Sequence, residues 1–170
     1  MAIITGIPYL FNFGEQSIYT FSFYVNLFCW LSFLLIIFTV LKDFLKPKIA
    51  FIFTLICIFI IGNLASIFYI STENIYMSFI LLGFYFLIKY FKTKQYFFLT
   101  FALSLFILSM LIKPGSKFLA IIFTLYFIKE IYKNYISKFS YLIYGSFLFV
   151  LIQCAGLKYQ FGNFTISNID

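Results

Sequence analysis

Histidine and arginine are absent from this chain of 170 residues, and all twelve of its basic residues are lysines. Charged residues of both signs make up only 10% of the sequence. Without histidine, the chain has neither the side chain that most often exchanges protons near neutral pH nor the usual nitrogen ligand of zinc. Histidine-based catalysis is therefore excluded, and we expect no metal site and no cofactor.

Cysteine and acidic residues are also scarce. Cys29, Cys57 and Cys154 each lie inside an apolar run and form no Cys-x-x-Cys pair, which favours packing thiols over a disulfide or a metal site. Asp43 and Glu130 stand among lysines, where a solvated loop charge is the simpler interpretation. The sequence therefore identifies no catalytic residue.

Apolar residues make up 64% of the chain, and its mean hydropathy is +1.07. A water-soluble domain of this size has too little polar surface to cover so much apolar surface. The apolar runs are too long for strands and do not alternate as the strands of a membrane barrel do. The sequence predicts an all-α, multi-pass helical bundle, with one transmembrane domain over 1–170, in the inner (plasma) membrane of a bacterium.

Polar breaks divide the chain into about six apolar runs. At about 1.5 Å per residue, a helix of ~20 residues crosses the ~30 Å hydrocarbon core of a bilayer. The predicted spans are 17–41, 49–70, 73–91, 96–112, 116–132 and 139–157. Residues 1–16 are apolar but interrupted by Gly and Pro, which indicates an interfacial segment, and residues 158–170 form a polar tail. Six spans place both termini on the same side of the membrane.

The lysines are distributed unevenly between alternate loops. Nine lie on one side of the predicted membrane: Lys42, Lys46, Lys48, Lys89, Lys92, Lys94, Lys129, Lys133 and Lys138. Three lie on the other: Lys113, Lys117 and Lys158. The positive-inside rule assigns the nine to the cytoplasm, so both termini are predicted outside. The net charge of +7 therefore reflects topology, and we expect membrane lipids rather than nucleic acid as partners.

The predicted spans 73–91 and 96–112 are separated by only four residues, so they should be antiparallel neighbours. Their far ends then bring Glu73 and Lys113 to the same outer face, with Lys117 nearby. One interpretation is structural: Glu73 starts a helix and pairs with Lys113, whose long side chain reaches toward the membrane surface. The other is functional: Glu73 faces a polar substrate, and the lysines bind a phosphate.

Several short motifs follow one another along the chain. Residues 6–10, Gly-Ile-Pro-Tyr-Leu, precede the first span, and the basic turn 42–48 follows it. Residues 71–73, Ser-Thr-Glu, lie at the outward-facing start of a span. Residues 113–115, Lys-Pro-Gly, interrupt the helix at the outer face. In this order, and with the tail segment 159–167, the chain resembles the GT-C superfamily of membrane glycosyltransferases. This superfamily includes protein mannosyltransferases and aminoarabinose transferases.

The resemblance implies an enzyme that transfers a sugar from a polyprenyl-phosphate-linked donor on the outer membrane face. A carboxylate acts there as the base, and cationic side chains hold the lipid phosphate. It thus implies substrate binding at Glu73, Lys113 and Lys117. The family's catalytic acid usually lies in a first outward loop after a first span, and this chain contains neither. We therefore expect either a piece of a longer protein, with that span and an acid-bearing loop encoded upstream, or a divergent relative.

A non-enzymatic membrane protein is the alternative, either a transporter subunit or a scaffold of an envelope complex. Transporters more often carry polar residues at mid-membrane or interrupted spans. Asn26, Asn63 and Gln153 are the candidate residues of this kind.

Overall fold

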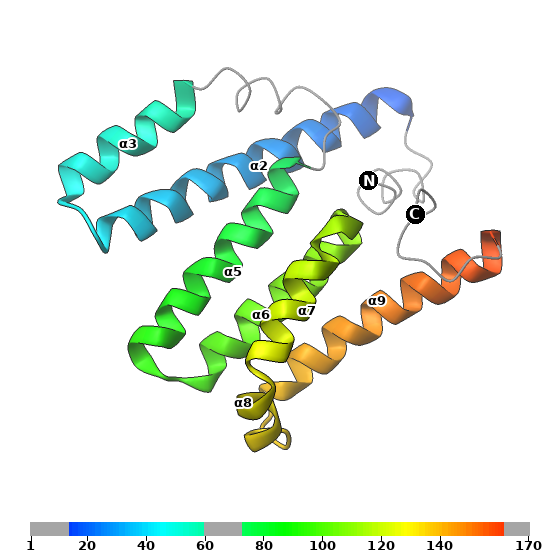
Figure 1. Ribbon diagram of the computed structural model, residues 1–170. Helices are drawn as coiled ribbons and strands as arrows, with labels where there is room; N and C mark the ends of the chain where they lie inside the picture. Colours follow the sequence, from blue (N-terminus) through cyan, green and yellow to red (C-terminus); the bar gives the residue numbers. More distant parts are fainter. Residues whose placement is uncertain (1–13, 60–72, 162–170) are drawn as a thin grey trace. The chain divides into compact units, whose positions relative to one another are not determined.

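The computed structural model describes residues 14–59 and 73–161, and all regular elements in these two ranges are helices (Figure 1). They are α2 (Glu15–Lys42), α3 (Pro47–Phe59), α5 (Glu73–Thr93), α6 (Tyr96–Ile112), the 3-10 helix η1 (Pro114–Ser116), α7 (Lys117–Tyr126), α8 (Ile128–Lys133) and α9 (Ser140–Phe161). The prediction of an all-α fold is confirmed for the described residues.

Three of the described helices are long and apolar enough to cross a membrane: Gln16–Lys42, Glu73–Thr93 and Ser140–Tyr159. They overlap the predicted first, third and sixth spans. The chain thus has the helices of an integral membrane protein. Six spans, outward termini and a bacterial inner membrane remain predictions.

The other three predicted spans correspond to shorter helices. α3 has 13 residues, and the rest of the predicted span 49–70 lies outside the described residues. α6 has 17 residues and matches the predicted span 96–112. The predicted span 116–132 is not one helix in the structure, because α7 ends at Tyr126 and α8 follows after Phe127. Phe127 leaves helical geometry, with φ −97° and ψ 13°, and its ring is buried.

By its contacts, the chain divides into two compact units, residues 1–81 and 82–170, here called unit 1 and unit 2. In unit 1, α2 packs against α3, and their core is formed by Trp30 and Leu34. Cys57 and Ile58, near the end of α3, pack against this core. Since α3 begins only a few residues after α2 ends, the two helices are antiparallel. The prediction of a single bundle over the whole chain stays a prediction.

In unit 2, α6 is the central helix. Its core side chains are 0% exposed: Leu99, Ala102, Leu103, Phe106 and Ile107. α6 packs against both α7 and α9. The ring of Phe106 also contacts the rings of Phe84 on α5 and Phe123 on α7, at centroid distances of 5.2 Å and 5.0 Å. Aromatic packing around α6 thus joins three helices of unit 2.

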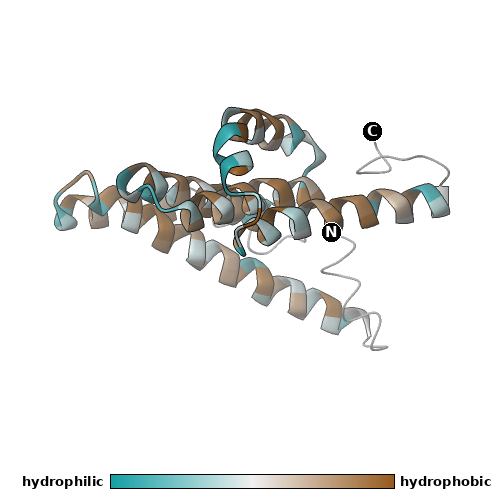
Figure 2. Ribbon diagram, turned by 90° about the horizontal axis from the view of Figure 1, so that it is seen from below, coloured by the Kyte–Doolittle hydropathy of each residue, from teal (hydrophilic) through white to brown (hydrophobic). Residues whose placement is uncertain are grey.

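Many apolar side chains on the outer faces of the described helices are exposed. Phe28 of α2, Ile122 of α7 and Phe149 of α9 are 72%, 63% and 63% exposed. Figure 2 shows hydrophobic colour along the helices and hydrophilic colour mainly at the turns. Such extensive exposed apolar surface is unfavourable in water and favourable in contact with lipid tails, in agreement with a membrane location.

Candidate functional site

The turn that joins α6 to α7, here called the Lys113 turn, carries two of the three predicted site residues. α6 ends at Ile112, and Lys113 has an extended backbone with φ −133° and ψ 108°. Pro114 accounts for this ending, because proline disfavours a helical conformation of the preceding residue and has no N–H to donate. Pro114 begins η1, and α7 begins at Lys117. The two lysines therefore flank a sharp turn at one end of unit 2.

Two buried serines hold this turn. Ser109 and Ser116 are 0% and 4% exposed, and their hydroxyl oxygens lie 3.0 Å apart. The Ser116 hydroxyl donates to the carbonyl oxygen of Lys113 at 2.8 Å, and the Ser116 N–H donates to the same oxygen at 3.0 Å. The N–H of Lys113 donates to the carbonyl oxygen of Ser109 at 2.9 Å. Three hydrogen bonds to buried groups thus fix the main chain of Lys113.

The positive charge at the Lys113 turn comes from ammonium groups rather than from backbone amides. The N–H groups of Ser116 and Lys117 donate to carbonyl oxygens of the turn itself, so they are not directed at a ligand. Both lysine side chains are partly exposed. In the part of unit 2 that the structure describes, Glu130 is the single carboxylate, and it lies on α8 at the other end. Two lysine ammonium groups can attract a phosphate as point charges.

An exposed apolar stripe runs along α7 from this turn. Its four side chains are 51% to 66% exposed and are spaced at i, i+3, i+4 and i+7: Phe118, Ile121, Ile122 and Leu125. This spacing places them on one side of the helix. Ala120 and Phe123 lie on the opposite side, where Ala120 is 3% exposed and Phe123 contacts Phe106. α7 therefore presents an apolar face to its surroundings, and that face begins one residue after Lys117.

Glu73, the third predicted site residue, begins α5, and its side chain is exposed. The partial positive charge at a helix N-terminus stabilises a carboxylate in the first turn, which agrees with the structural interpretation. Ser71 and Thr72, the other two residues of the Ser-Thr-Glu motif, lie outside the described residues. Glu73 belongs to unit 1, whereas Lys113 and Lys117 belong to unit 2. The pairing of Glu73 with Lys113 therefore stays a prediction.

Unit 1 contains a group of buried polar side chains, of which only Asn26 was singled out from the sequence. Ser22 and Asn26 on α2 are 3% and 2% exposed, and Asn74 and Ser78 on α5 are each 8% exposed. The Ser78 hydroxyl lies 2.6 Å from the carbonyl oxygen of Cys29 and 2.8 Å from that of Asn74, and so links α5 to α2. The i, i+4 spacing within each pair was the available sequence signal, because it places both residues on one helix face.

The remaining candidates are dispersed. Gln153 is half-buried on α9, and Asn63 lies outside the described residues. Cys29, Cys57 and Cys154 are thiols on three different helices. Within residues 14–59 and 73–161, no group of three His, Cys, Asp or Glu side chains could hold a metal ion.

The sequence matches no protein-family model, and it matches neither a curated protein nor a solved structure. Its function is therefore inferred from the chemistry of the Lys113 turn, the α7 stripe and the sequence motifs.

Proposed function

We propose that this chain is a glycosyltransferase-like membrane protein that binds a polyprenyl-phosphate-linked sugar donor at the Lys113 turn. The observation that carries the proposal is the juxtaposition of two lysines with the exposed apolar stripe of α7. A polyprenyl phosphate has the matching order of groups, with a charged phosphate at the membrane surface and a long hydrocarbon chain in the lipid. The motif order described above supports a sugar as the transferred group.

Each residue has a distinct role in this proposal. Lys113 contacts the phosphate, because its main chain is fixed by Ser109 and Ser116 and its ammonium group therefore starts from a defined position. Lys117 adds a second positive charge one helical turn later. The α7 stripe contacts the first isoprene units. We assign the catalytic base to no residue of this chain.

We test the proposal by measuring how the purified full chain binds a polyprenyl phosphate after Lys113→Gln and after Lys117→Gln. A cation near an anionic lipid headgroup contributes about 1 kcal/mol, so Lys113→Gln should weaken binding by roughly fivefold. Lys117→Gln should have a smaller effect, and Lys46→Gln, in the turn between α2 and α3, should have none. Ile122→Ser on the stripe should weaken binding of a long polyprenyl phosphate more than binding of a short-chain phosphate.

The opposite result would be that Lys113→Gln and Lys117→Gln both weaken the binding of polyprenyl phosphate by the same small factor. Lysines that only extend toward the membrane surface would behave in this way, since exposed ion pairs contribute about 0–1 kcal/mol. In that case the Lys113 turn is not a phosphate site, and the proposed function fails.

The buried polar residues of unit 1 favour a second candidate, a transporter subunit or a scaffold of an envelope complex. Polar side chains inside membrane helices face the protein interior and often mark a transport path or an interhelical contact. Asn26, at 2% exposure on the apolar helix α2, is such a residue. For this candidate, the wild-type chain should have no measurable affinity for polyprenyl phosphate.

A further inference from the structure

Six lysines lie in two segments at the end of unit 2 opposite to the Lys113 turn. They belong to the last turns of α5, the α5–α6 connection, and the segment from α8 to the start of α9: Lys89, Lys92, Lys94, Lys129, Lys133 and Lys138. Glu130 is the single carboxylate among them. This end of unit 2 therefore has a strong net positive charge.

Aromatic and hydroxyl contacts hold the two lysine-bearing segments together. The ring of Phe127, which is 5% exposed, lies 5.6 Å from the ring of Tyr90 and 6.0 Å from that of Phe91. The Tyr96 hydroxyl lies 2.8 Å from the Ser140 hydroxyl oxygen, which joins the start of α6 to the start of α9. The lysines of both segments thus lie at one end of a packed unit rather than on independent loops.

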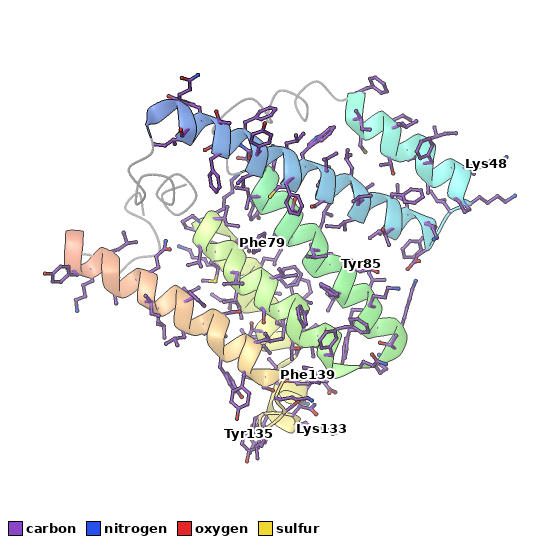
Figure 3. The ribbon with its side chains drawn as sticks, turned by 180° about the vertical axis from the view of Figure 1, so that it is seen from behind. Lys48, Phe79, Tyr85, Lys133, Tyr135 and Phe139 are labelled. Carbon is purple, nitrogen blue, oxygen red and sulfur yellow. The ribbon has the colours of Figure 1, made fainter. Side chains whose placement is uncertain are left out.

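Large apolar and aromatic side chains are exposed among these lysines. Ile128, Tyr132 and Ile136 are 54%, 79% and 70% exposed, although they stand next to or between charged residues. Figure 3 shows Lys133, Tyr135 and Phe139 together at this end. In water the exposure of these apolar side chains is unfavourable. In the headgroup layer of a bilayer it is favourable, because tyrosine rings and lysine side chains are both stabilised there.

We propose that the segment from Phe127 to Phe139 lies in the headgroup layer and binds the anionic headgroups of phospholipids, with Lys129 and Lys133 as the principal contacts. These two lysines are at positions i and i+4 of α8, so they project from the same helix face. α8 follows the apolar helix α7 directly and precedes α9, which keeps the segment at the boundary of the apolar part of unit 2. The six lysines match the negative charge of the lipid, and the exposed apolar side chains match its acyl boundary.

This inference does not depend on the sugar-donor proposal, since it concerns other residues at the other end of unit 2. The test uses the full chain in detergent, titrated with phosphatidylglycerol and separately with phosphatidylcholine, and native mass spectrometry counts the bound lipids. The wild-type chain should bind phosphatidylglycerol at least tenfold more tightly. The double variant Lys129→Gln/Lys133→Gln should lose about tenfold or more of that preference, given the strength of each lysine contact near an anionic surface.

Two controls make the result specific. Lys46→Gln/Lys48→Gln removes the same charge from unit 1 and should keep most of the preference, and Lys129→Arg/Lys133→Arg should keep it as well. Glycerol phosphate in excess should not displace the lipid, because it lacks the acyl chains that contact Tyr132 and Ile136. The proposal is wrong if the wild-type chain does not discriminate between the two lipids. It is also wrong if both Gln double variants lose the preference equally, or if glycerol phosphate displaces the lipid.

Discussion

At the scale of single residues, Gly83 packs tightly against the ring of Phe106. A Cβ atom built on Gly83 would lie 2.5 Å from Cε1 and 2.9 Å from Cδ1 of the Phe106 ring. That ring is fully buried and also stacks on Phe123 at 5.0 Å, so it has little room to move. The absence of a side chain at position 83 is therefore what allows the Phe106 ring of α6 to lie against α5.

Gly83→Ala should destabilise the protein, by about 1–3 kcal/mol if the core cannot relax, because the added methyl group overlaps the Phe106 ring. The measurement is the apparent melting temperature in detergent. Gly145→Ala on α9 is the matched control, since no atom lies within 4 Å of a Cβ built there, and alanine is the better helix former. Phe106→Leu should partly restore the Gly83→Ala variant, and an unchanged melting temperature after Gly83→Ala alone would contradict the prediction.

At the scale of the helices, side-chain hydroxyls form hydrogen bonds between helices whose surfaces are otherwise almost entirely apolar. Lipid tails are as apolar as leucine, so helix association in a membrane depends on close packing and on interhelical hydrogen bonds. The bond from Ser78 on α5 to the carbonyl oxygen of Cys29 on α2 and the bond between Tyr96 on α6 and Ser140 on α9 are of this kind. They join residues that are 49 and 44 positions apart in the sequence.

Ser78→Ala should lower the free energy of unfolding by about 0.6 kcal/mol, and by no more than about 1.7 kcal/mol, which is the range of interhelical hydrogen bonds in membranes. Unfolding by sodium dodecyl sulfate in mixed micelles is the suitable assay. Ser32→Ala provides the control, because the Ser32 hydroxyl donates only within α2, to the carbonyl oxygen of Phe28 at 2.8 Å. Equal effects of the two substitutions would show that the Ser78 bond does not stabilise the contact between α2 and α5.

At the scale of the whole molecule, the positions of the lysines predict which ends of the helices face the cytoplasm. In unit 2, α6 and α9 start at the same end, as the Tyr96–Ser140 contact shows, and Figure 1 shows both running toward the opposite end. Six lysines lie at the starting end, whereas Lys113, Lys117 and Lys158 lie at the other. The lysines that alternate loops of the sequence separate are therefore also separated in space, at opposite ends of unit 2.

Alkaline phosphatase, which is active only outside the cytoplasm, should be active when fused after Ser71 or after Gly115. Fusions after Lys46 or after Lys94 should be inactive, because the positive-inside rule retains these turns in the cytoplasm. Green fluorescent protein fused at the same four positions should give the reciprocal pattern and shows that the inactive fusions are expressed. The reverse pattern would place the Lys113 turn in the cytoplasm and would remove it from the outer-face donor site.

Hydropathy and charge were sufficient to predict the helical class, the three long helices, the Lys113 turn and the separation of lysines. Each of these depends on residues that are neighbours in the sequence: about 20 apolar residues make a span, and a proline ends the preceding helix. The same reasoning selected Lys113 and Lys117 as site candidates from their place beside Pro114 and Gly115.

Only the tertiary structure revealed the buried pair Ser109 and Ser116, the polar group around Asn26 and Ser78, and the interruption of the predicted fifth span at Phe127. In a sequence where nearly every helix face is apolar, periodicity does not tell a lipid-facing side from a protein-facing side. The buried side is decided by contacts between distant residues, such as Phe127 with Tyr90, and such contacts form only when the helices pack.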